Sequence, residues 1–305
     1  MEEYPKTLME LEQQFNTEEA CLEYLSKIRW PEGFRCMRCG HDKAWVTKEN
    51  LHFCIRCHFK NSVLVGTIFQ DTKKPLRLWF RAIWQLTTQK YGANALGLQR
   101  VLGLGSYRTA WTWLHKLRRA MVRPGRDRLS STVQVDEIYI GGEKPGKRGR
   151  GAAGKALVVV MVELKEGKAG RIRLKRVADA SGPSLEGAVK EGVEPGSIVQ
   201  TDGWEGYGGL SELGYVHEVI RKEAAIGKNL LPKVNRVVAL LKRWLLGTYQ
   251  GRVESSYLDY YLDEFTFRFN RRMSASRGKL FYRLIQQAVA IEPLLPKGIH
   301  HEFVK

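Results

Sequence analysis

The sequence lacks any hydrophobic run long enough to cross a membrane. Its longest apolar stretches, such as Ala156–Val162, are far shorter than the roughly 20 residues that a spanning helix needs. The first residues, Met-Glu-Glu-Tyr-Pro, contain neither the basic start nor the apolar core of a secretory signal. We therefore expect a cytoplasmic protein with no membrane partner.

Cysteine is scarce, and its spacing excludes a secreted disulfide framework. The 305-residue chain has five cysteines, an odd number arranged as two close pairs plus Cys21. Cys21 shares a helical face with Leu25, which predicts a buried core residue. The chain is long enough for two or three modules with a sizeable core.

Acidic residues are too few to balance the basic ones. Fifty Lys and Arg stand against 32 Asp and Glu, which gives a formal net charge of +18. Such an excess attracts polyanions, and DNA binding gains affinity by releasing counterions. The charge favours a nucleic-acid partner over a ribosomal or membrane-surface role, and it is consistent with association with the nucleoid. It says nothing about catalysis.

The paired cysteines predict a zinc ribbon. Two Cys-x2-Cys knuckles are separated by fourteen residues, and they comprise Cys36, Cys39, Cys54 and Cys57. Two such knuckles complete the tetrahedron that zinc prefers, and four thiolates close its shell, so the ion is expected to be structural. A redox function would need only one pair. His52 and His58 flank the knuckles, and we interpret both as surface or packing residues.

Residues 63–124 have a helical pattern that resembles a helix-turn-helix. Apolar residues recur at helical spacing after Pro75, glycines mark a turn at Gly103–Gly105, and Ser106 is suited to cap the helix that follows. This last helix carries four basic residues that we predict to contact DNA: Arg108, Lys116, Arg118 and Arg119. The alternative is an ordinary helical bundle with a solvated basic face.

The composition changes after a linker at Pro124–Asp127, where strand patterns begin. Strands are expected at Thr132–Ile140, Ala156–Glu163, Arg171–Val177, Ser197–Thr201 and Tyr215–Ile220. Helices are expected at Ser184–Lys190, Pro232–Leu246, Tyr257–Arg272 and Lys279–Ala290. This order of elements is α/β.

These patterns divide the chain into five parts. They are an N-terminal helical segment (1–33), the zinc ribbon (34–62), the helix-turn-helix-like domain (63–124), an α/β domain (130–290) and a C-terminal tail (291–305).

Two aspartates occupy unusual positions in the α/β domain. Alternation along the first strand puts Asp136 and Glu137 on opposite faces, so these two carboxylates cannot easily share an ion. Aspartate is disfavoured inside a strand, which favours a functional role for Asp136. Asp202 follows a later strand at its carboxyl end, where sites form in open α/β sheets. Because Asp-Gly is also a common turn, the position of Asp202 alone does not decide between the two interpretations.

The helix that begins near Pro232 offers two more candidates. Its buried stripe includes Val234 and Val238. Asn235 and Lys242 are seven residues apart, so they fall on nearly the same face, roughly 10 Å apart along the axis. A metal ligand and a cation for DNA could therefore project toward one site.

Together these residues resemble the DDE-type transposases. The resemblance is narrower to bacterial insertion-sequence transposases with an N-terminal zinc ribbon, in which the third catalytic residue is often Asn rather than Glu. The matching stretches occur in order along the chain: Cys36–Cys57, Ala110–Met121, Val135–Gly142, Thr201–Tyr207, Asn235–Gly247 and Asp263–Arg272. They span almost the whole chain, which makes the resemblance more specific than the paired aspartates alone.

The resemblance implies a ribonuclease-H-like catalytic domain that cuts and joins DNA with Mg²⁺ or Mn²⁺. It assigns Asp136 to the first strand, Asp202 to the end of the fourth strand, Asn235 to the third position and Lys242 to the trailing basic position. Asp136 would bridge two divalent ions, while Asp202 and Asn235 would each complete one shell. An amide oxygen at Asn235 brings no charge, so one ion should be held less tightly.

The resemblance also implies double-stranded DNA as the partner, both as element ends and as target, and at least a homodimer when two ends are brought together. A glycine-containing loop beside the first aspartate suits phosphate binding and carries Lys144, Lys147, Arg148 and Arg150. The alternative interpretation of this loop is a solvated basic segment. We interpret His217 as a hydrogen-bonded strand residue in preference to a catalytic one.

Two other functions fit the same motifs. One is a DNA-binding regulator, or a decayed transposase, that binds ends without cutting them. The other is a nuclease of the same fold, which hydrolyses DNA but never joins it. Strand transfer distinguishes the predicted transposase from both.

Overall fold

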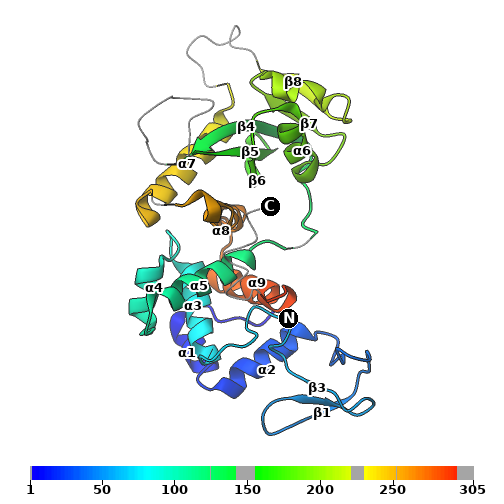
Figure 1. The fold of residues 1–305 in the computed structure, drawn as a ribbon, viewed down its shortest axis with the longest axis vertical. Coiled ribbons are helices and arrows are strands. Elements are labelled where there is room, and N and C mark those ends of the chain that lie inside the picture. Colours follow the sequence, from blue (N-terminus) through cyan, green and yellow to red (C-terminus); the bar gives the residue numbers. More distant parts are fainter. Residues whose placement is uncertain (1, 124, 142–154, 221–229, 252, 294–305) are drawn as a thin grey trace. The chain divides into compact units, whose positions relative to one another are not determined.

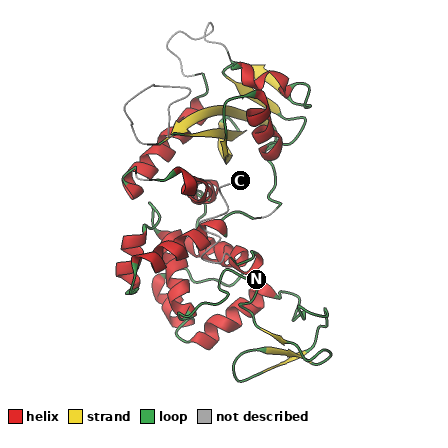
Figure 2. Ribbon diagram, in the orientation of Figure 1, coloured by secondary structure: helices red, strands yellow, loops and turns green. Residues whose placement is uncertain are grey.

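The computed structural model describes residues 2–123, 125–141, 155–220, 230–251 and 253–293. The chain divides into two compact units, which are drawn as ribbons in Figures 1 and 2. Unit 1 comprises Met1–Arg123 together with Met273–Lys305, and unit 2 is the intervening Pro124–Arg272. None of the helices in the described ranges is long and apolar enough to cross a membrane.

Unit 1 is built mainly of helices whose starts follow from local sequence. They are α1 (Leu8–Gln14), α2 (Glu18–Arg29), α3 (Leu76–Thr88), α4 (Ala95–Leu102), α5 (Tyr107–Arg119) and α9 (Arg277–Ala290). Thr17, Asn94 and Ser106 cap α2, α4 and α5, because the side-chain oxygen of each accepts a backbone N–H of the first turn. Gly103 adopts the left-handed conformation that ends α4.

Helix α9 belongs to unit 1, which corrects the domain boundary expected from the sequence. Residues 277–290 directly follow the α/β domain in the chain, so sequence order favours placing them there. In the structure α9 packs against α2 and α3 instead. Phe281 lies against the rings of Phe15 and Phe80, and its side chain is fully buried. The apolar face of α9 thus completes the core of unit 1, a long-range contact that helical periodicity cannot indicate.

A small antiparallel sheet follows α2. Its strands, in the order β1-β2-β3, are β1 (Ala44–Val46), β2 (His52–Cys54) and β3 (Lys60–Asn61). The guanidinium group of Arg29, the last residue of α2, donates to the carbonyl oxygen of Val63 at 2.6 Å. His52 lies against the rings of Trp30 and Phe34. These contacts attach the small sheet to the end of α2, and the half-buried His52 packs against aromatic rings there.

Unit 2 contains a five-stranded mixed sheet in the order β6-β5-β4-β7-β8. Its strands are β4 (Thr132–Ile140), β5 (Ala156–Lys165), β6 (Lys168–Val177), β7 (Ile198–Thr201) and β8 (Val216–Val219). Strand β4 pairs antiparallel with β5 and parallel with β7, and β7 pairs parallel with β8. The central position of β4 explains why Val133 and Val135 are fully buried.

Helices cover both faces of this sheet (Figure 1). On one face lie α7 (Pro232–Tyr249) and α8 (Leu258–Asn270), which is preceded by the short 3-10 helix η3 (Ser255–Tyr257). On the other face lie α6 (Gly182–Gly192) and the 3-10 helix η1 (Glu205–Leu210). Alternate residues of β5, such as Val158 and Val159, enter the two opposite cores. A strand buried on both faces requires the continuous apolar run that its sequence shows.

The α/β class is confirmed as a mixed α/β arrangement with small shifts of the expected bounds. Strand β4 has the predicted limits. Strand β6 begins at Lys168 rather than Arg171, because a tight turn at Glu166 and Gly167, both with positive φ, joins it directly to β5. The short helix α1 and the strands of the small sheet were not indicated by periodicity, since elements of two to seven residues give too few repeats.

The carboxyl group of Asp263 on α8 makes the stability of unit 2 depend on pH. Burial raises the pKa of Asp263 from its ordinary value of 3.8 to about 7. The charge of Arg126 lowers this pKa, and the charge of Asp259 raises it further. Between these two pH values the folded protein keeps a proton that the unfolded chain has released. The free energy of unfolding therefore falls as the pH rises through this window.

We expect Asp263→Asn to raise the free energy of unfolding at pH 8 by at most about 4 kcal/mol and to change it little at pH 4. The amide replaces a carboxylate that is costly to bury when charged. Chemical denaturation at both pH values measures the effect. An equal change in the free energy of unfolding at the two pH values would contradict the raised pKa of Asp263.

Candidate functional site

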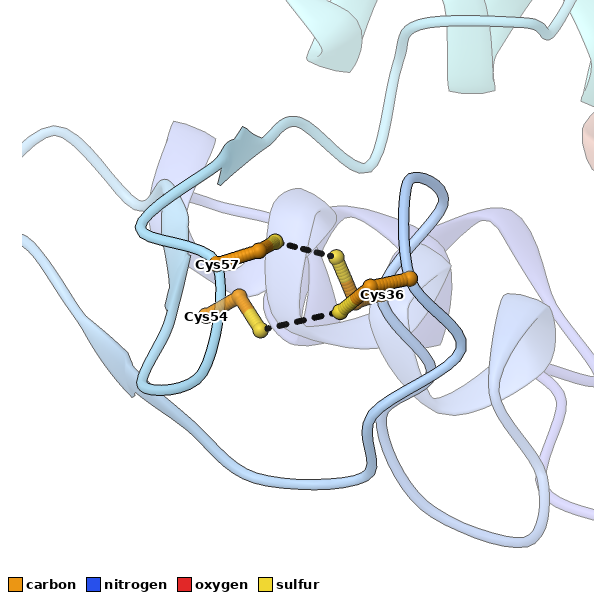
Figure 3. Close-up of side chains that lie close together, drawn as sticks. Cys36, Cys54 and Cys57 are labelled. Atoms are coloured by element: carbon orange, nitrogen blue, oxygen red, sulfur yellow. Dashed lines mark hydrogen bonds between the residues drawn. The ribbon is translucent and has the colours of Figure 1, made fainter.

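The four paired cysteines converge on one point in unit 1. Their ligand atoms all lie within 4.8 Å of one another. The sulfur of Cys36 lies 3.5 Å from that of Cys57, and the sulfur of Cys39 lies 3.7 Å from that of Cys54 (Figure 3). Within the described ranges, no other group of three or more Cys, His, Asp or Glu residues has this geometry. Four convergent sulfurs fit the closed tetrahedral shell of a structural zinc ion.

Local hydrogen bonds favour the thiolate form of Cys36. Although burial opposes it, the backbone N–H groups of Cys39 and Arg38 lower the pKa of Cys36 to about 6. Burial raises the pKa of the adjacent Cys57 to about 12. Zinc binding requires the sulfurs to be thiolates, so it releases the protons that they carry.

Asn61 joins the two knuckles, a role that the sequence did not reveal. The residue is fully buried, and its Oδ1 accepts the Met37 N–H at 2.8 Å. Its Nδ2 donates to the carbonyl oxygen of Phe59 at 3.0 Å and lies 3.6 Å from the sulfur of Cys36. A single Asn after the second knuckle is too common a feature to single out from sequence alone.

In unit 2, β4 carries Asp136 and pairs in parallel with β7, which Asp202 directly follows. The parallel register aligns Gln134 with Gln200. The paired register ends there: Asp136 lies two residues further along β4, and Asp202 directly follows the end of β7. The side chains of the two glutamines are 3.3 Å apart, so they share one face, and alternation along β4 assigns Asp136 to the same face.

The residues after each aspartate hold its carboxylate in place. The Glu137 N–H donates to Asp136 Oδ1 at 2.9 Å, and the Trp204 N–H donates to Asp202 Oδ1 at 3.0 Å. On the other face, the buried hydroxyl of Tyr207 donates to Glu137 Oε2 at 3.0 Å. Burial and the charges of Glu137, Asp136 and Asp202 all raise the pKa of Tyr207. The hydrogen bond between Tyr207 and Glu137 ties η1 to β4.

Asn235 lies in the first turn of α7, on the flank of its buried stripe. The Lys233 N–H of the same turn donates to Gln134 Oε1 at 3.1 Å, so this end of α7 lies over the sheet face that carries Asp136. Asn235 and Lys242 are both exposed. Among the residues that the structure describes, no further Asp, Glu, His or Cys completes a metal-binding group with Asp136 and Asp202.

The predicted DNA-binding residues have different outcomes. Lys144, Lys147, Arg148 and Arg150 lie outside the described residues. On α5, Arg108 is exposed, Lys116 and Arg119 are half-buried, and burial lowers the pKa of Lys116. Arg118 is only 1% exposed, and its guanidinium group donates to the carbonyl oxygen of Ala93 at 3.4 Å. The prediction that Arg118 contacts DNA is therefore wrong, because this side chain lies on the core-facing side of α5.

His217 lies on the sheet face opposite to Asp136. It is paired in register with Val199, whose side chain belongs to the core under α6. Its Nε2 atom lies 2.9 Å from Thr201 Oγ1. Burial lowers the pKa of His217, so the imidazole is neutral at pH 7. His217 is thus a hydrogen-bonded strand residue, as the sequence favoured.

These features define a class: a protein that joins a four-cysteine zinc ribbon to a mixed α/β domain, with one aspartate inside its central strand and another directly after the neighbouring parallel strand. Comparison with known families makes the class specific. A transposase zinc-ribbon domain matches residues 16–60, and an ISXO2-like transposase domain matches residues 128–270. Over these two domains the chain resembles insertion-sequence transposases with a DDE-type domain, which confirms the resemblance found in the sequence.

One curated relative and one solved structure give further comparisons. The chain is 26% identical over 140 residues to an uncharacterized protein in transposable element ISH50 from Halobacterium salinarum. That match covers 45% of each chain, so it spans less than half the length of the relative. A structure of a simian T-cell lymphotropic virus intasome in complex with PP2A regulatory subunit B56 gamma matches 62% of this chain and 70% of the other, at 14% identity. Its TM-score of 0.32 is too low to carry a conclusion.

We expect the purified protein to contain zinc and Cys39→Ser to lose it, because three thiolates leave the tetrahedral shell open. Cys21→Ala is the matched control. Cys21 is fully buried in α2 and is not one of the four clustered cysteines, so its loss should lower stability but retain zinc. Elemental analysis of both variants measures the difference. Equal zinc loss in the two variants would argue against the assigned ligands.

Proposed function

We propose that this protein is a DNA transposase that binds the ends of an insertion sequence and catalyses divalent-metal-dependent strand cleavage and strand transfer. The observation that carries the proposal is the parallel pairing of β4 with β7, in which Gln134 pairs with Gln200, two residues before Asp136 and Asp202 respectively. This pairing lies within the stretch matched by an ISXO2-like transposase domain.

We further propose that unit 2 is a ribonuclease-H-like domain. The family resemblance implies one aspartate on the first strand and another after the fourth strand. Strand β4 is the first strand of the five-stranded sheet along the chain, and β7 is the fourth. This agreement supports the assignment of the catalytic domain to the sheet and to the helices that cover it.

We assign α4, the turn after it and α5 to a helix-turn-helix-like DNA-binding domain, next to the zinc ribbon at 34–62. A four-residue turn, Gly103–Ser106, separates α4 from α5. The exposed Arg108 in the first turn of α5 is well placed for a groove or a phosphate. The net charge of +18 supports double-stranded DNA as the partner, as ends and as target.

Asp136, Asp202 and Asn235 would hold Mg²⁺ or Mn²⁺, since carboxylate and amide oxygens suit these ions. Bound there, two ions would activate a water or a DNA 3′-hydroxyl and stabilise the leaving oxygen at phosphorus. The hydrogen bonds to one oxygen of each aspartate fix how the other oxygen is presented. Lys242, about two turns along α7 from Asn235, would hold a DNA phosphate as a point charge.

The proposed reaction requires two DNA ends to be brought together, so we expect at least a homodimer in the active complex. The protein would work where the element's DNA lies, in the cytoplasm and associated with the nucleoid. No covalent protein–DNA intermediate is needed, because the aspartates act as ligands rather than nucleophiles.

Asp136→Asn and Asp202→Asn should each reduce cleavage and joining by more than about 100-fold. Residues that merely orient metal ligands already contribute about 10–100-fold, and these two are proposed as ligands. The assay uses labelled DNA carrying the terminal sequences of the element, with Mg²⁺ or Mn²⁺. Glu212→Gln is the matched control, because Glu212 is exposed after η1 and has no assigned role.

The same assay separates the alternative functions. End binding without cleavage by the unmodified protein would favour a regulator or a decayed transposase. Cleavage without joining would favour a hydrolytic nuclease. Full activity of both aspartate variants would refute the assigned site.

Arg108→Ala should weaken DNA binding by a similar factor at every DNA sequence. The slope of the logarithm of the binding constant against the logarithm of the salt concentration should fall by about 1, the value for one phosphate contact. The thermal stability of this variant should not change, because the side chain is exposed. Arg118→Ala should instead lower stability, since Arg118 is buried. Fluorescence anisotropy across a salt series, with thermal melts of both variants, measures these effects. An unchanged salt slope for Arg108→Ala would exclude a phosphate contact.

A further inference from the structure

A chain of hydrogen bonds crosses the sheet of unit 2 one row away from the two aspartates. It starts at the backbone N–H of Lys233 in α7, which donates to Gln134 Oε1 at 3.1 Å. Gln134 Nε2 donates to Gln200 Oε1 at 3.3 Å. Gln200 Nε2 donates to Glu218 Oε2 at 3.0 Å. This amide relay, formed by Lys233 N–H, Gln134, Gln200 and Glu218, connects α7 to β4, β7 and β8.

The chemistry at its two ends fixes the direction of the relay. A backbone N–H can only donate, so Gln134 must turn its oxygen toward Lys233. An ionised carboxylate can only accept, so Gln200 must turn its NH₂ group toward Glu218. In the bond between the two glutamines, Gln134 Nε2 must then donate to Gln200 Oε1. The relay therefore has one orientation, and the negative charge of Glu218 lies at the acceptor end.

Gln134 also provides the start of α7 with an acceptor that its own sequence lacks. The N-cap of α7 is Leu231, which offers no side-chain hydrogen bond, and Pro232 has no N–H to donate. Gln134 is 6% exposed, so its amide would be costly to bury without partners. The hydrogen bond between the Lys233 N–H and Gln134 Oε1 gives the first turn of α7 an acceptor and gives the buried amide of Gln134 a partner. It thereby fixes the first turn of α7 against β4.

The relay also has a regular spacing from the proposed metal ligands. Asp136 lies two residues after Gln134, and Asp202 lies two residues after Gln200. Asn235 likewise lies two residues after Lys233, in the same turn of helix. Each element that carries a proposed ligand is therefore held by the relay two positions before that ligand.

We propose that the amide relay positions Asn235 relative to Asp136 and Asp202 and thereby sets the affinity of the site for its divalent cation. The inference rests on the proposed metal-dependent function. A neutral ligand attracts a cation less than a carboxylate does, so its contribution depends on correct placement more than on charge. Gln134, Gln200 and Glu218 are positioning residues, because none of them is a proposed ligand.

The test measures Mn²⁺ binding to the full chain by calorimetry, without DNA and without turnover. Gln134→Leu and Gln200→Leu should each weaken Mn²⁺ binding about 10-fold, the size found when groups that orient metal ligands are removed. Hydrogen exchange should show faster exchange of the Lys233 amide in both variants. Unchanged Mn²⁺ affinity together with a lost Lys233 protection would overturn the proposal.

A double substitution separates positioning from general destabilisation. If the relay acts through Asn235, then Gln134→Leu should weaken Mn²⁺ binding by less than about twofold when Asn235→Ala is already present. Equal losses in both backgrounds would show that Gln134 acts elsewhere in unit 2, which would also overturn the proposal.

Exposed Glu218 gives a pair of variants with little risk to folding. Glu218→Gln keeps an oxygen acceptor and should retain most of the affinity, whereas Glu218→Leu should lose several-fold. Glu212→Leu is the matched control and should bind Mn²⁺ normally. Identical affinities of the two Glu218 variants would contradict an acceptor role.

The outcomes also separate this inference from the proposed function. If the unmodified protein binds no Mn²⁺, or if Asp136→Ala binds it equally well, the proposed metal site fails and the relay proposal fails with it. If Asp136→Ala abolishes binding while the relay variants bind normally, the metal site stands and only the relay proposal is overturned.

Discussion

The parallel pairing of β4 with β7 is the constraint on which the site in unit 2 depends. The side-chain period of a strand is two, so a slip of one residue would move Gln200 to the face occupied by His217 and would shift Asp202, which directly follows the strand. Strand β7 has only four residues, and its own pairing gives little resistance to such a slip. Contacts at the start of both strands add resistance to a slip. Leu129 forms a bridge with Val193, and the Ile198 N–H donates to the Ser131 carbonyl oxygen at 2.8 Å. The register is thus set upstream of the residues that use it.

The zinc ribbon is stabilised by different interactions from those of unit 2. Its strands have two or three residues each, too few to bury a core of their own. The four sulfurs, the buried Asn61 and the hydrogen bond from Arg29 to Val63 replace that core. Order in this region therefore depends on coordination and on α2, whereas order in unit 2 depends on apolar burial across both faces of a sheet.

Much of unit 2 could be predicted because its pattern is local. Alternation gave the limits of β4 and separated Asp136 from Glu137, and the uniformly apolar β5 indicated a strand covered on both faces. What could not be predicted depends on contacts between distant segments. The burial of Arg118 depends on the carbonyl group of Ala93, and the position of α9 depends on the rings of Phe15 and Phe80. Composition marks such residues as basic or apolar, but it does not say which surface they meet.

The return of α9 to unit 1 has a consequence for the order in which the chain can fold during synthesis. Every residue of Pro124–Arg272 leaves the ribosome before α9 does, so unit 2 is able to complete its core first. Unit 1 begins first but must wait for the helix that carries Phe281 before its aromatic cluster closes. In a nascent chain, unit 2, which carries Asp136 and Asp202, would therefore fold while residues 1–123 of unit 1 still expose apolar surface. In this sense unit 2 is a continuous insertion, and unit 1 is the part of the molecule whose core closes last.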